Sequence, residues 1–327
     1  GYATGTNAAT YNDNLSATSA ASANYNISYV NGSLIIAKAP LTITGATTNV
    51  TYNASAQTNS GATVSGRQGS DVFTVSGYAT GTNAATYNDV LTTSSSAASN
   101  YNITYVNGSL VVAPKTLTIT NPTVSNKVYD SGTTATVSST GTLSGFIGTQ
   151  TVTVGSSTGT FVGVGNVGTG ISVTVSYTLA NGANGGLASN YTVSNSTVTA
   201  NITAKALTIS GETVSNKMYD STNAATLNKA SAALVGVIAG DIVTLNTASA
   251  AATFASTNVG TAIAVTVTGN SISGSDSGNY TLTQPTGLTA NITQKALTAS
   301  MVVADKTYDG TTTATPTFTI SGLIGSQ

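Results

Sequence analysis

Apolar and polar residues alternate with a period of two along most of the chain. Leu117 and Ile119 stand between threonines. Val173 and Val175 are likewise separated by a single polar residue. Because successive side chains of a β-strand point to opposite faces, this alternation predicts strands with one buried and one solvated face. Only residues 231–237 are compatible with a helix, and they lack capping residues and a sustained helical period. The pattern therefore predicts an all-β protein.

Asn-Gly pairs separate alternating runs at two places in the chain. Asn31-Gly32 follows residues 25–29, and Asn107-Gly108 follows residues 101–105. Asn-Gly is the pair preferred in the two-residue turns of β-hairpins, since both central residues of such a turn take positive φ. The sequence thus predicts a hairpin at each pair.

Two families of internal repeats organise the chain. Residues 1–13 return unchanged 76 positions later as residues 77–89, and residues 24–37 return as a near copy at 100–113. A second family begins with Lys-x-Leu-Thr at Lys115, Lys205 and Lys295, at a spacing of 90. Repeats of this length are typical of tandem domains that each have a core of their own.

We call members of the first family short repeats and members of the second family long repeats. The predicted units are the C-terminal half of a short repeat at 1–37, a complete short repeat at 38–113, complete long repeats at 114–204 and 205–294, and the N-terminal part of a further long repeat at 295–327. The first and last units are thus expected to be incomplete repeats, unable to bury their apolar faces alone.

The repeat length favours one small sandwich for each unit, because it exceeds the length of a propeller blade. Asp276-Ser-Gly-Asn-Tyr280 resembles the tyrosine corner of immunoglobulin-like domains, in which a Tyr hydroxyl ties a strand to a loop. The preceding long repeat keeps Tyr191 but has Leu187 in place of the aspartate. We therefore expect a tandem array of small immunoglobulin-like β-sandwiches. The alternative is a β-grasp unit, with one short helix across a mixed sheet.

The charge balance argues against nucleic-acid binding, and the length of the apolar runs argues against a membrane span. The chain has nine basic and ten acidic residues, with a net charge of −1 at pH 7. A near-neutral surface offers no electrostatic attraction to nucleic acid. No apolar run approaches the roughly 18 to 20 residues of a membrane-spanning helix. We expect neither nucleic-acid binding nor a membrane span in this segment.

The residue types needed for most enzyme chemistry are missing. The chain has no histidine and no cysteine, which excludes Ser-His-Asp and Cys-His nucleophiles and the usual zinc sites. Glu212 is the only glutamate, and the aspartates occur one to three to a repeat. Hydrolysis by a pair of carboxylates is therefore not indicated. We expect a protein that is not an enzyme and holds no cofactor.

The repeat motifs carry a resemblance to a known family. Each long repeat has Lys-x-Leu-Thr, then Lys-x-Tyr-Asp, and, where complete, Asn-Val-Gly-Thr, Asn-Tyr-Thr and Thr-Ala-Asn-Ile-Thr. This series resembles the YDG domains of large secreted bacterial adhesins. The short repeat, with Asn49-Val-Thr-Tyr52 and residues 100–110, is similar to the MBG domains found beside them, although Asn53 follows Tyr52 where aspartate is expected.

The resemblance implies a filamentous haemagglutinin-like exoprotein of a Gram-negative bacterium, located outside the cell or on its surface. In such proteins these repeats form the stalk or the region that spans the matrix. We therefore expect a structural segment involved in cell adhesion or in a biofilm matrix, with neighbouring repeats or copies of the chain as partners.

Two other functions remain open at this point. Asn- and Tyr-rich loops are suited to binding matrix or host glycans, which would make the chain a carbohydrate-binding adhesion module. Alternatively, a surface with few charges has little repulsion to keep open strand edges apart, which would favour self-association into extracellular fibres.

Tyrosines recur at two fixed places in the long repeats, and we expect them to be structural. A tyrosine ring can fill the core of a thin sandwich while its hydroxyl reaches a loop or the rim. The rival interpretation is an exposed platform on which sugars stack. The first set is Tyr129, Tyr219 and Tyr308, preceded by Lys127, Lys217 and Lys306, and the second set is Tyr191 and Tyr280.

Asp130, Asp220 and Asp309 recur after the first set of tyrosines and are weak candidates for calcium ligands. Calcium takes about six to eight oxygen ligands, several of them from carboxylates, and each junction between repeats supplies only one or two acidic residues here. Aspartate before Ser, Thr or Gly commonly starts a turn by accepting a hydrogen bond from its own backbone. We favour the turn.

Overall fold

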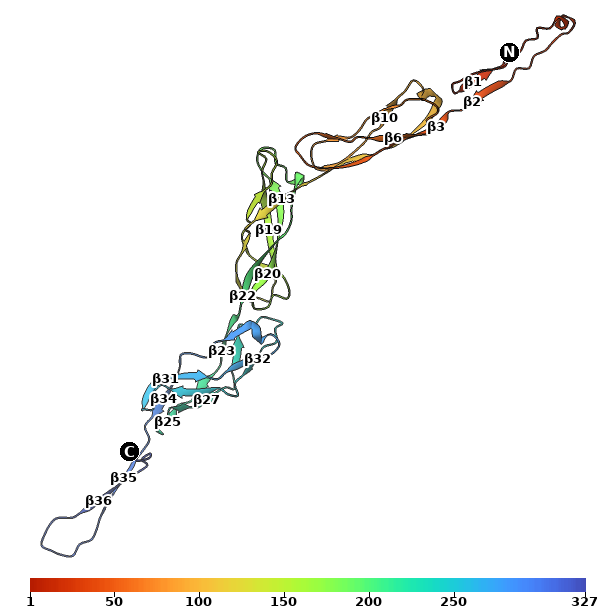
Figure 1. Cartoon of the computed structure of the whole chain (residues 1–327). Helices are drawn as coiled ribbons and strands as arrows, with labels where there is room; N and C mark the ends of the chain where they lie inside the picture. Colours follow the sequence, from red (N-terminus) through yellow and green to blue (C-terminus); the bar gives the residue numbers. More distant parts are fainter. The chain divides into compact units, whose positions relative to one another are not determined.

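The computed structural model describes residues 1–327, apart from the side chain of Ala20. Its regular elements are β-strands and short 3₁₀ turns (Figure 1). The predicted all-β class is confirmed. The described residues include no α-helix, and so none that could lie across a sheet as the β-grasp alternative requires. None of their helical segments has the length and apolarity needed to cross a membrane.

The chain divides into two compact units. The first comprises residues 1–123, 139–158 and 175–196, and the second comprises residues 124–138, 159–174 and 197–327. The division runs through the long repeat at 114–204, whose longer strands contribute to both units.

Residues 1–113 form short strands in several small sheets. The elements are β1 (Ala9–Asn12), η1 (Ala20–Asn24), β2 (Ser33–Ile36), β3 (Ala39–Gly45), β4 (Thr47–Thr51), β5 (Gln57–Thr58), β6 (Ala62–Ser65), β7 (Thr74–Ser76), β8 (Thr80–Gly81), β9 (Ala85–Asn88), β10 (Thr92–Ser94), η2 (Ala98–Asn100), β11 (Tyr101–Val106) and β12 (Ser109–Ala113). The alternation of apolar residues with threonine in β3 places Leu41 and Ile43 in the core of this repeat, beside Phe73, Leu91 and Tyr101.

The hairpin prediction at the Asn-Gly pairs is wrong. Asn107-Gly108 joins β11 to β12, but β11 pairs with β3, whereas β12 pairs with β4 and β9 in another sheet. Neither residue has positive φ. Gly108 is needed for a different reason, because a Cβ there would lie 2.0 Å from the carbonyl oxygen of Ala46. Close approach of two backbones, and not turn conformation, explains this glycine. At Asn31-Gly32 likewise, β2 pairs with β1 and not with residues 25–29.

The two long repeats share one strand order. The elements of the first are β13 (Lys115–Thr120), β14 (Thr123–Val124), β15 (Lys127–Val128), β16 (Thr134–Ala135), β17 (Val137–Ser139), β18 (Thr142–Ser144), β19 (Val152–Phe161), β20 (Gly168–Asn181), η3 (Ala188–Asn190), β21 (Tyr191–Val193) and β22 (Ser196–Thr203). Its larger sheets have the orders β18-β13-β21 and β15-β22-β20-β19-β16.

The second long repeat and the C-terminal segment follow. The elements are β23 (Lys205–Ser210), β24 (Thr213–Val214), β25 (Lys217–Met218), β26 (Ala224–Ala225), β27 (Leu227–Asn228), β28 (Ala233–Val235), β29 (Thr244–Asn246), β30 (Ala251–Phe254), β31 (Gly260–Thr268), β32 (Ser271–Ser273), η4 (Ser277–Asn279), β33 (Tyr280–Leu282), β34 (Leu288–Thr293), β35 (Thr298–Val303) and β36 (Pro316–Ser321). The orders β28-β23-β33 and β25-β34-β31-β30-β26 reproduce those of the first long repeat.

The first strand of every complete repeat lies between two neighbours of opposite direction. On one side β3, β13 and β23 each pair with an antiparallel strand. On the other side each pairs with a parallel strand that starts at a tyrosine. The aligned pairs are Ala39 with Tyr101, Lys115 with Tyr191, and Lys205 with Tyr280.

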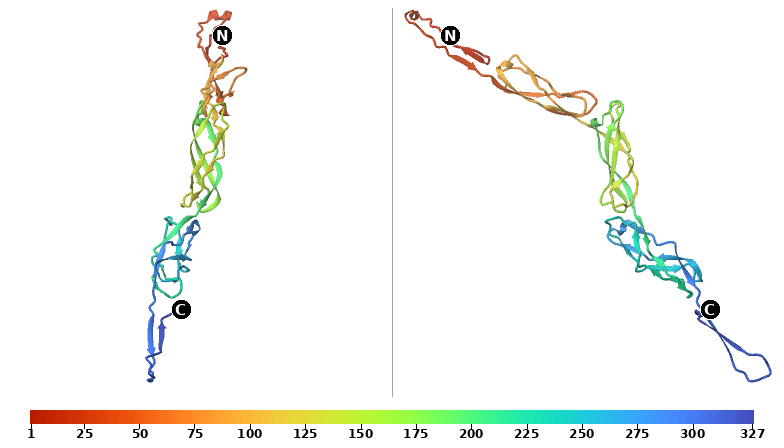
Figure 2. Two further views of the ribbon diagram at one scale, coloured as in Figure 1. Left: turned by 90° about the vertical axis from the view of Figure 1, so that its left-hand side faces the viewer. Right: turned by 180° about the vertical axis from the view of Figure 1, so that it is seen from behind.

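The C-terminal segment contains only the antiparallel half of this arrangement. Strands β35 and β36 pair with each other and have no third strand beside them (Figure 2). Thr298 aligns with Ser321, as Thr118 aligns with Ser144 in the first long repeat. All residues of both strands are exposed.

Candidate functional site

Each complete repeat contains a turn that starts with glycine and ends with aspartate or glutamine. We call residues 66–71, 145–150 and 236–241 the acceptor turns. The backbone N–H of the last residue donates to the carbonyl oxygen three positions earlier, at 3.2 Å for Asp71, 3.1 Å for Gln150 and 3.1 Å for Asp241. The first glycine has positive φ in all three, which a residue with a Cβ rarely adopts. The hydrogen bond and the glycine conformation together fix the backbone of the turn, and with it the position of the Asp or Gln side chain at its end.

A buried tyrosine of the same repeat binds each acceptor turn. The hydroxyl of Tyr280 accepts from the N–H of Ile238 at 3.0 Å and donates to the Asp241 carboxylate at 2.5 Å. Tyr191 makes the same two bonds, with the Ile147 N–H at 3.3 Å and the Gln150 side-chain oxygen at 2.6 Å. In the short repeat Tyr101 bonds in the same way to Gln68 and Asp71.

A second tyrosine reaches two of these turns from the preceding repeat. The Tyr52 hydroxyl donates to the Gln150 side-chain oxygen at 3.0 Å, and the Tyr129 hydroxyl donates to the Asp241 carboxylate at 3.0 Å. One oxygen atom in each turn therefore accepts two tyrosine hydroxyls, one from each repeat. We call these sites the tyrosine junctions.

The two rings of each tyrosine junction meet edge to face. Tyr52 and Tyr191 have ring centroids 5.5 Å apart at an interplanar angle of 80°. Tyr129 and Tyr280 lie at 5.5 Å and 79°. Aromatic pairs prefer this geometry because the positive edge of one ring faces the negative face of the other. All four rings are buried, with 4 to 5% of their surface exposed.

A pair of asparagines accompanies each junction. In the first, Asn190 accepts from the N–H of Ala84 at 2.7 Å and donates to the side-chain oxygen of Asn83 at 2.9 Å. The same two bonds join Asn279 to Val167 and Asn166, and join Asn100 to Ala8 and Asn7. Asn190 and Asn279 are buried, so these bonds satisfy amides that water does not reach.

Apolar packing continues across the junction between the short repeat and the next. A single cluster of buried side chains contains Tyr52, Leu110 and Val112 of the short repeat together with Leu117 and Tyr191 of the long repeat. Separating the two repeats would expose this surface to water, at a cost of about 25 cal/mol for each Å² of apolar area. The junction is therefore a packed interface as well as a set of hydrogen bonds.

Burial and the nearby carboxylate keep the hydroxyls of the second junction protonated. Burial, followed by the hydrogen bond to Asp241, raises the pKa of Tyr129 to about 12. The same two causes raise the pKa of Tyr280. In the short repeat, the hydrogen bond to Asp71 raises the pKa of Tyr101. Both hydroxyls at Asp241 thus remain donors over the physiological pH range.

Comparison with protein-family models finds the YDG domain twice, at residues 113–200 and 203–287. Together the two matches cover more than half of the 327 residues. The chain belongs to the YDG domain family. No curated protein and no solved structure matches the chain.

In the YDG repeats, the Lys-x-Tyr-Asp motif forms a closed loop from which the tyrosine projects. The ammonium group of Lys127 bonds to the Asp130 carboxylate and to the carbonyl oxygen of Gly132, both at 2.5 Å. It also lies 5.6 Å from the centroid of the Phe161 ring, within cation–π range. The lysine thus closes the loop next to Tyr129.

The Lys-x-Tyr-Asp motifs that begin at Lys217 and Lys306 form the same loop. The Lys217 ammonium lies 2.6 Å from the Asp220 carboxylate, and the Lys306 ammonium lies 2.9 Å from that of Asp309. The hydrogen bond from Lys217 is the main cause that lowers the pKa of Asp220 to about 2. The pKa of Asp130 and that of Asp309 are lowered for the same reason.

Each of these aspartates has one carboxylate oxygen, Oδ1, engaged within the loop. Oδ1 of Asp130 accepts from the N–H of Gly132, and Oδ1 of Asp220 and of Asp309 each accepts from the N–H two residues on, at 2.9 to 3.0 Å. Among the residues that the structure describes, no three acidic side chains come together where they could hold a metal ion. The geometry is that of a turn closed by a lysine.

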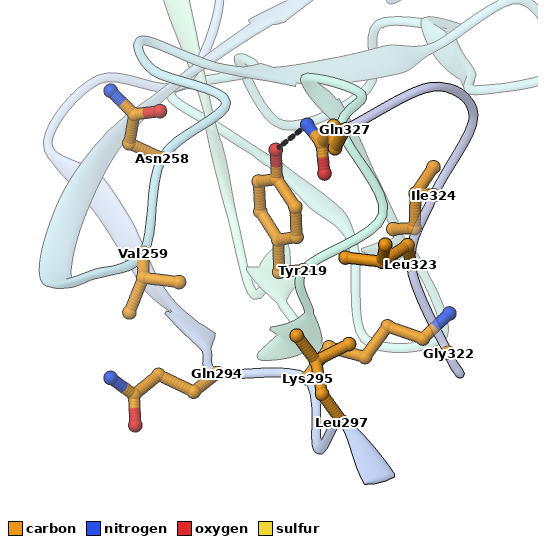
Figure 3. Close-up of a pocket in the computed structure, with 10 residues that line it drawn as sticks. All are labelled: Tyr219, Asn258, Val259, Gln294, Lys295, Leu297, Gly322, Leu323, Ile324 and Gln327. Carbon is orange, nitrogen blue, oxygen red and sulfur yellow. Dashed lines mark hydrogen bonds between the residues drawn. The ribbon is translucent and has the colours of Figure 1, made fainter. Parts of the chain in front are cut away.

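The structure separates the tyrosines that the sequence grouped together. Tyr129, Tyr191 and Tyr280 lie in the tyrosine junctions. Tyr219 is half-buried and accepts a hydrogen bond from the side-chain amide of Gln327 at 2.7 Å (Figure 3). Tyr308 is 94% exposed, because the hairpin of β35 and β36 packs nothing against it.

In the motif from Asp276 to Tyr280, the aspartate and the tyrosine bond to different groups. Asp276 does not bond to Tyr280. Its carboxylate instead accepts from the N–H of Ile242 at 2.8 Å, while the Tyr280 hydroxyl bonds at Asp241. The side chains of Asp276 and Tyr280 therefore both hold the acceptor turn, or the residue that follows it, near the start of β33.

Sequence reasoning missed Tyr52, the acceptor residues Gln150 and Asp241, and the asparagines that pair across the junctions. One signal was present, since Asn-Val-Gly recurs at Asn166 and Asn258. A motif also marks Gln150, since residues 144–150 (SGFIGTQ) return as residues 321–327 (SGLIGSQ), whereas Asp241 differs from Gln150 in residue type and charge.

Proposed function

We propose that this chain is a non-enzymatic stalk segment of a secreted or cell-surface bacterial adhesin, in which YDG repeats follow MBG-like repeats. Its role would be in cell adhesion or in a biofilm matrix. The observation that carries the proposal is the tyrosine junction, in which a tyrosine of one repeat is buried in the next. The extracellular location rests on the resemblance of the repeat motifs to those of adhesins.

A stalk must transmit force between repeats without bending at each connection. Bending a tyrosine junction would break hydroxyl bonds to a shared acceptor, separate an asparagine pair and disrupt an edge-to-face contact between rings. At Asp241 the acceptor is a carboxylate, and hydrogen bonds to ionised groups are roughly twice as strong as neutral ones. Each junction therefore resists bending through several contacts that act together.

The buried tyrosines do not support the alternative of a carbohydrate-binding module based on these rings. Stacking on a sugar needs an exposed ring face. Tyr129, Tyr191 and Tyr280 instead have 4 to 5% of their surface exposed and contact other protein groups. Binding of glycans by other loops stays a separate hypothesis, which an array of immobilised glycans probed with the whole chain would test.

The rigidity of the junction can be measured by the distribution of distances between two spin labels. The chain has no cysteine, so labels attach only at engineered positions such as Ser172→Cys and Ser231→Cys, both exposed. We expect a narrow distribution in the otherwise unchanged chain and a broader one with Tyr129→Ala. Tyr2→Ala, at a site that is 88% exposed, is the control. A distribution that Tyr129→Ala leaves unchanged would contradict the proposal.

The location is tested on the bacterium that produces the protein. Antibodies raised against residues 1–327 should label intact cells or the surrounding matrix. Labelling that appears only after the cells are permeabilised would exclude a role in adhesion, whatever the stiffness of the junctions.

A further inference from the structure

The second YDG repeat buries a carboxylate that belongs to none of the ion pairs among the described residues. Glu212 is 5% exposed, and Nδ2 of Asn270 donates to its Oε2 atom at 3.3 Å. Its Oε1 atom is buried and has no hydrogen-bond partner. Oδ1 of Asn270, a residue that is 7% exposed, is buried and unpartnered as well. Buried polar atoms are normally hydrogen-bonded, so two unpartnered oxygens on adjacent side chains point to a chemical role.

The strand register places Lys229 opposite Glu212. Strands β24 and β27 are antiparallel, with Val214 aligned with Leu227. Continuing this register by two positions aligns Glu212 with Lys229. Residues two apart on a strand project to the same face, as do residues that are directly opposite on paired strands. Val214 and Leu227 pack against the core of the repeat, so Glu212 and Lys229 lie on the core side of this small sheet.

The side chain of Lys229 reaches the turn between β29 and β30. Its ammonium group donates to the carbonyl oxygens of Thr247 at 2.7 Å and Ala250 at 3.1 Å. The same turn lies against the link between β31 and β32, because β29 pairs with β32 and β30 pairs with β31. That link is Gly269-Asn270, and a Cβ on the glycine would lie 2.3 Å from the carbonyl oxygen of Ser249 in the turn. Lys229 and the segment that carries Asn270 therefore contact the same turn.

The first YDG repeat lacks both charged side chains of this cluster. Strands β14 and β17 form the equivalent two-stranded sheet there. At the spacing of 90 that relates the two repeats, Pro122 stands in the position of Glu212, and Ser139 stands in that of Lys229. The acid and the lysine thus occur together in one repeat and are both missing from the other. Such joint occurrence is expected of residues that act on each other.

We propose that Lys229 and Asn270 become joined by an intramolecular isopeptide bond, with Glu212 carrying the protons. The bond forms between Nζ of the lysine and Cγ of the asparagine. Oε2 of Glu212 already holds the amide that reacts. Rotation of the flexible lysine side chain moves its ammonium group from the turn carbonyls to Oε1, the carboxylate oxygen without a partner.

The reaction exchanges one amide for another and changes no oxidation state. Glu212 takes a proton from the ammonium group, and its Oε1–H then donates to Oδ1 of Asn270, which polarises the amide. The neutral amine attacks Cγ, and a second proton passes from Nζ to Nδ2 as the bond between Cγ and Nδ2 breaks. Ammonia leaves and takes the first proton from Glu212 as an ammonium ion, so the carboxylate is restored. Both unpartnered oxygens thus have a role in the reaction.

The bond closes a covalent loop within one repeat. Tension applied to the two ends of the repeat could not then extend residues 229–270, because the chain between them is bypassed. The inference concerns chemistry inside the second YDG repeat, and it does not depend on the adhesin proposal.

The intact mass of the purified chain tests the bond directly. Formation of one bond releases one ammonia, so we expect the 32.2 kDa chain to be lighter than its sequence by about 17 Da. Glu212→Gln and Lys229→Arg should each restore the full mass. Lys205→Arg, the same substitution elsewhere in the repeat, should keep the deficit. Full mass in the unmodified chain, or a deficit that persists in Glu212→Gln with an unchanged circular dichroism spectrum, would overturn the proposal.

A protease that cleaves before aspartate locates the bond. It separates residues 220–240, which contain Lys229, from residues 241–275, which contain Asn270. We expect these two peptides to remain joined after denaturation, at about 17 Da below their summed mass, and to separate in Lys229→Arg. An ammonia loss confined to a single peptide, as when an Asn-Gly pair cyclises, would contradict the bond even if the intact mass showed the deficit.

Discussion

The tyrosine junctions at Gln150 and at Asp241 have nearly the same geometry but different acceptor chemistry. In both, one oxygen accepts two tyrosine hydroxyls at 2.5 to 3.0 Å, and the ring pairs have the same separation of 5.5 Å. The acceptor is a neutral amide in one and a carboxylate in the other. The position therefore requires an oxygen with free lone pairs, whereas its charge can vary.

The charge changes the strength of the junction more than its shape. A carboxylate strengthens the bonds that it accepts, and its field opposes ionisation of the tyrosines that donate them. The raised pKa of Tyr129 and that of Tyr280 both include this contribution from Asp241. Variants of the two junctions can therefore separate packing from charge.

Truncation of a junction tyrosine should have the largest effect. Tyr129→Ala removes a buried ring and both of its contacts in the next repeat, and we expect a loss of about 3 kcal/mol in the free energy of unfolding. Tyr219→Ala should cost less, since Tyr219 is only half-buried. Urea unfolding followed by tyrosine fluorescence measures both, because the chain has no tryptophan. Equal losses would mean that burial in the next repeat contributes nothing.

Removal of the hydroxyl alone should distinguish the two acceptors. Tyr129→Phe gives up a hydrogen bond to a carboxylate, with an expected loss of about 2 kcal/mol, whereas Tyr52→Phe gives up a bond to an amide, with an expected loss of about 1 kcal/mol. Amide hydrogen exchange at Ile147 and Ile238 reports on each junction separately. A larger loss at Tyr52 would show that charge does not decide the strength.

Alkaline pH should weaken the junction at Asp241. The pKa of Tyr129 is about 12 in the folded chain and 10.0 without these contacts, so folding favours the neutral hydroxyl. The stabilisation is fully present below pH 10 and is lost as the pH rises through about 12. Absorbance titration of the chain, with Tyr129→Phe to identify the signal, measures this pKa.

Asp241→Gln separates the effect of the carboxylate on the pKa of Tyr129 from the effect of burial. It removes the carboxylate but not the burial, so the pKa of Tyr129 should fall and remain above 10.0. An unchanged pKa would assign the whole shift to burial.

The loop aspartates should have the smallest effect. Asp220→Asn removes an exposed ion pair, and pairs of this kind contribute little to stability. We expect a slight fall in the melting temperature at pH 7. The pKa of Asp220 is lowered from 3.8 to about 2, so its contribution is present above pH 3.8 and is lost as the pH falls through about 2. A large effect at pH 7 would give Asp220 a role beyond its loop.

The sequence predicted the strands well, because burial on one face imposes a period of two. Leu117 and Val173 are buried where the alternation requires. It did not predict which strands pair. Asn107-Gly108 has the composition of a hairpin turn, yet the backbone passes there between two sheets, and the glycine is needed for close packing against Ala46. Local turn preference is weaker than the packing of distant segments.

Three of the four junction tyrosines were predictable from the sequence, but Tyr52 and the partners of all four were not. Recurrence identified Tyr129 and Tyr280 as structural residues, and their amphipathic side chains suggested a buried ring with a bonded hydroxyl. That the two meet at one carboxylate depends on how successive repeats pack, which no local pattern encodes. Gln150 and Asp241 differ in sequence because only one oxygen of each is needed.

The asparagine pairs also have a consequence for how a gene encoding such a protein can change. The short repeat and both YDG repeats bind the preceding segment through the same two asparagine bonds, which engage Asn7, Asn83 and Asn166. A unit of either kind thus meets its neighbour through the same asparagine connector. Unequal recombination that adds or deletes a whole unit leaves every remaining connector intact, so the length of the array can evolve without any new interface.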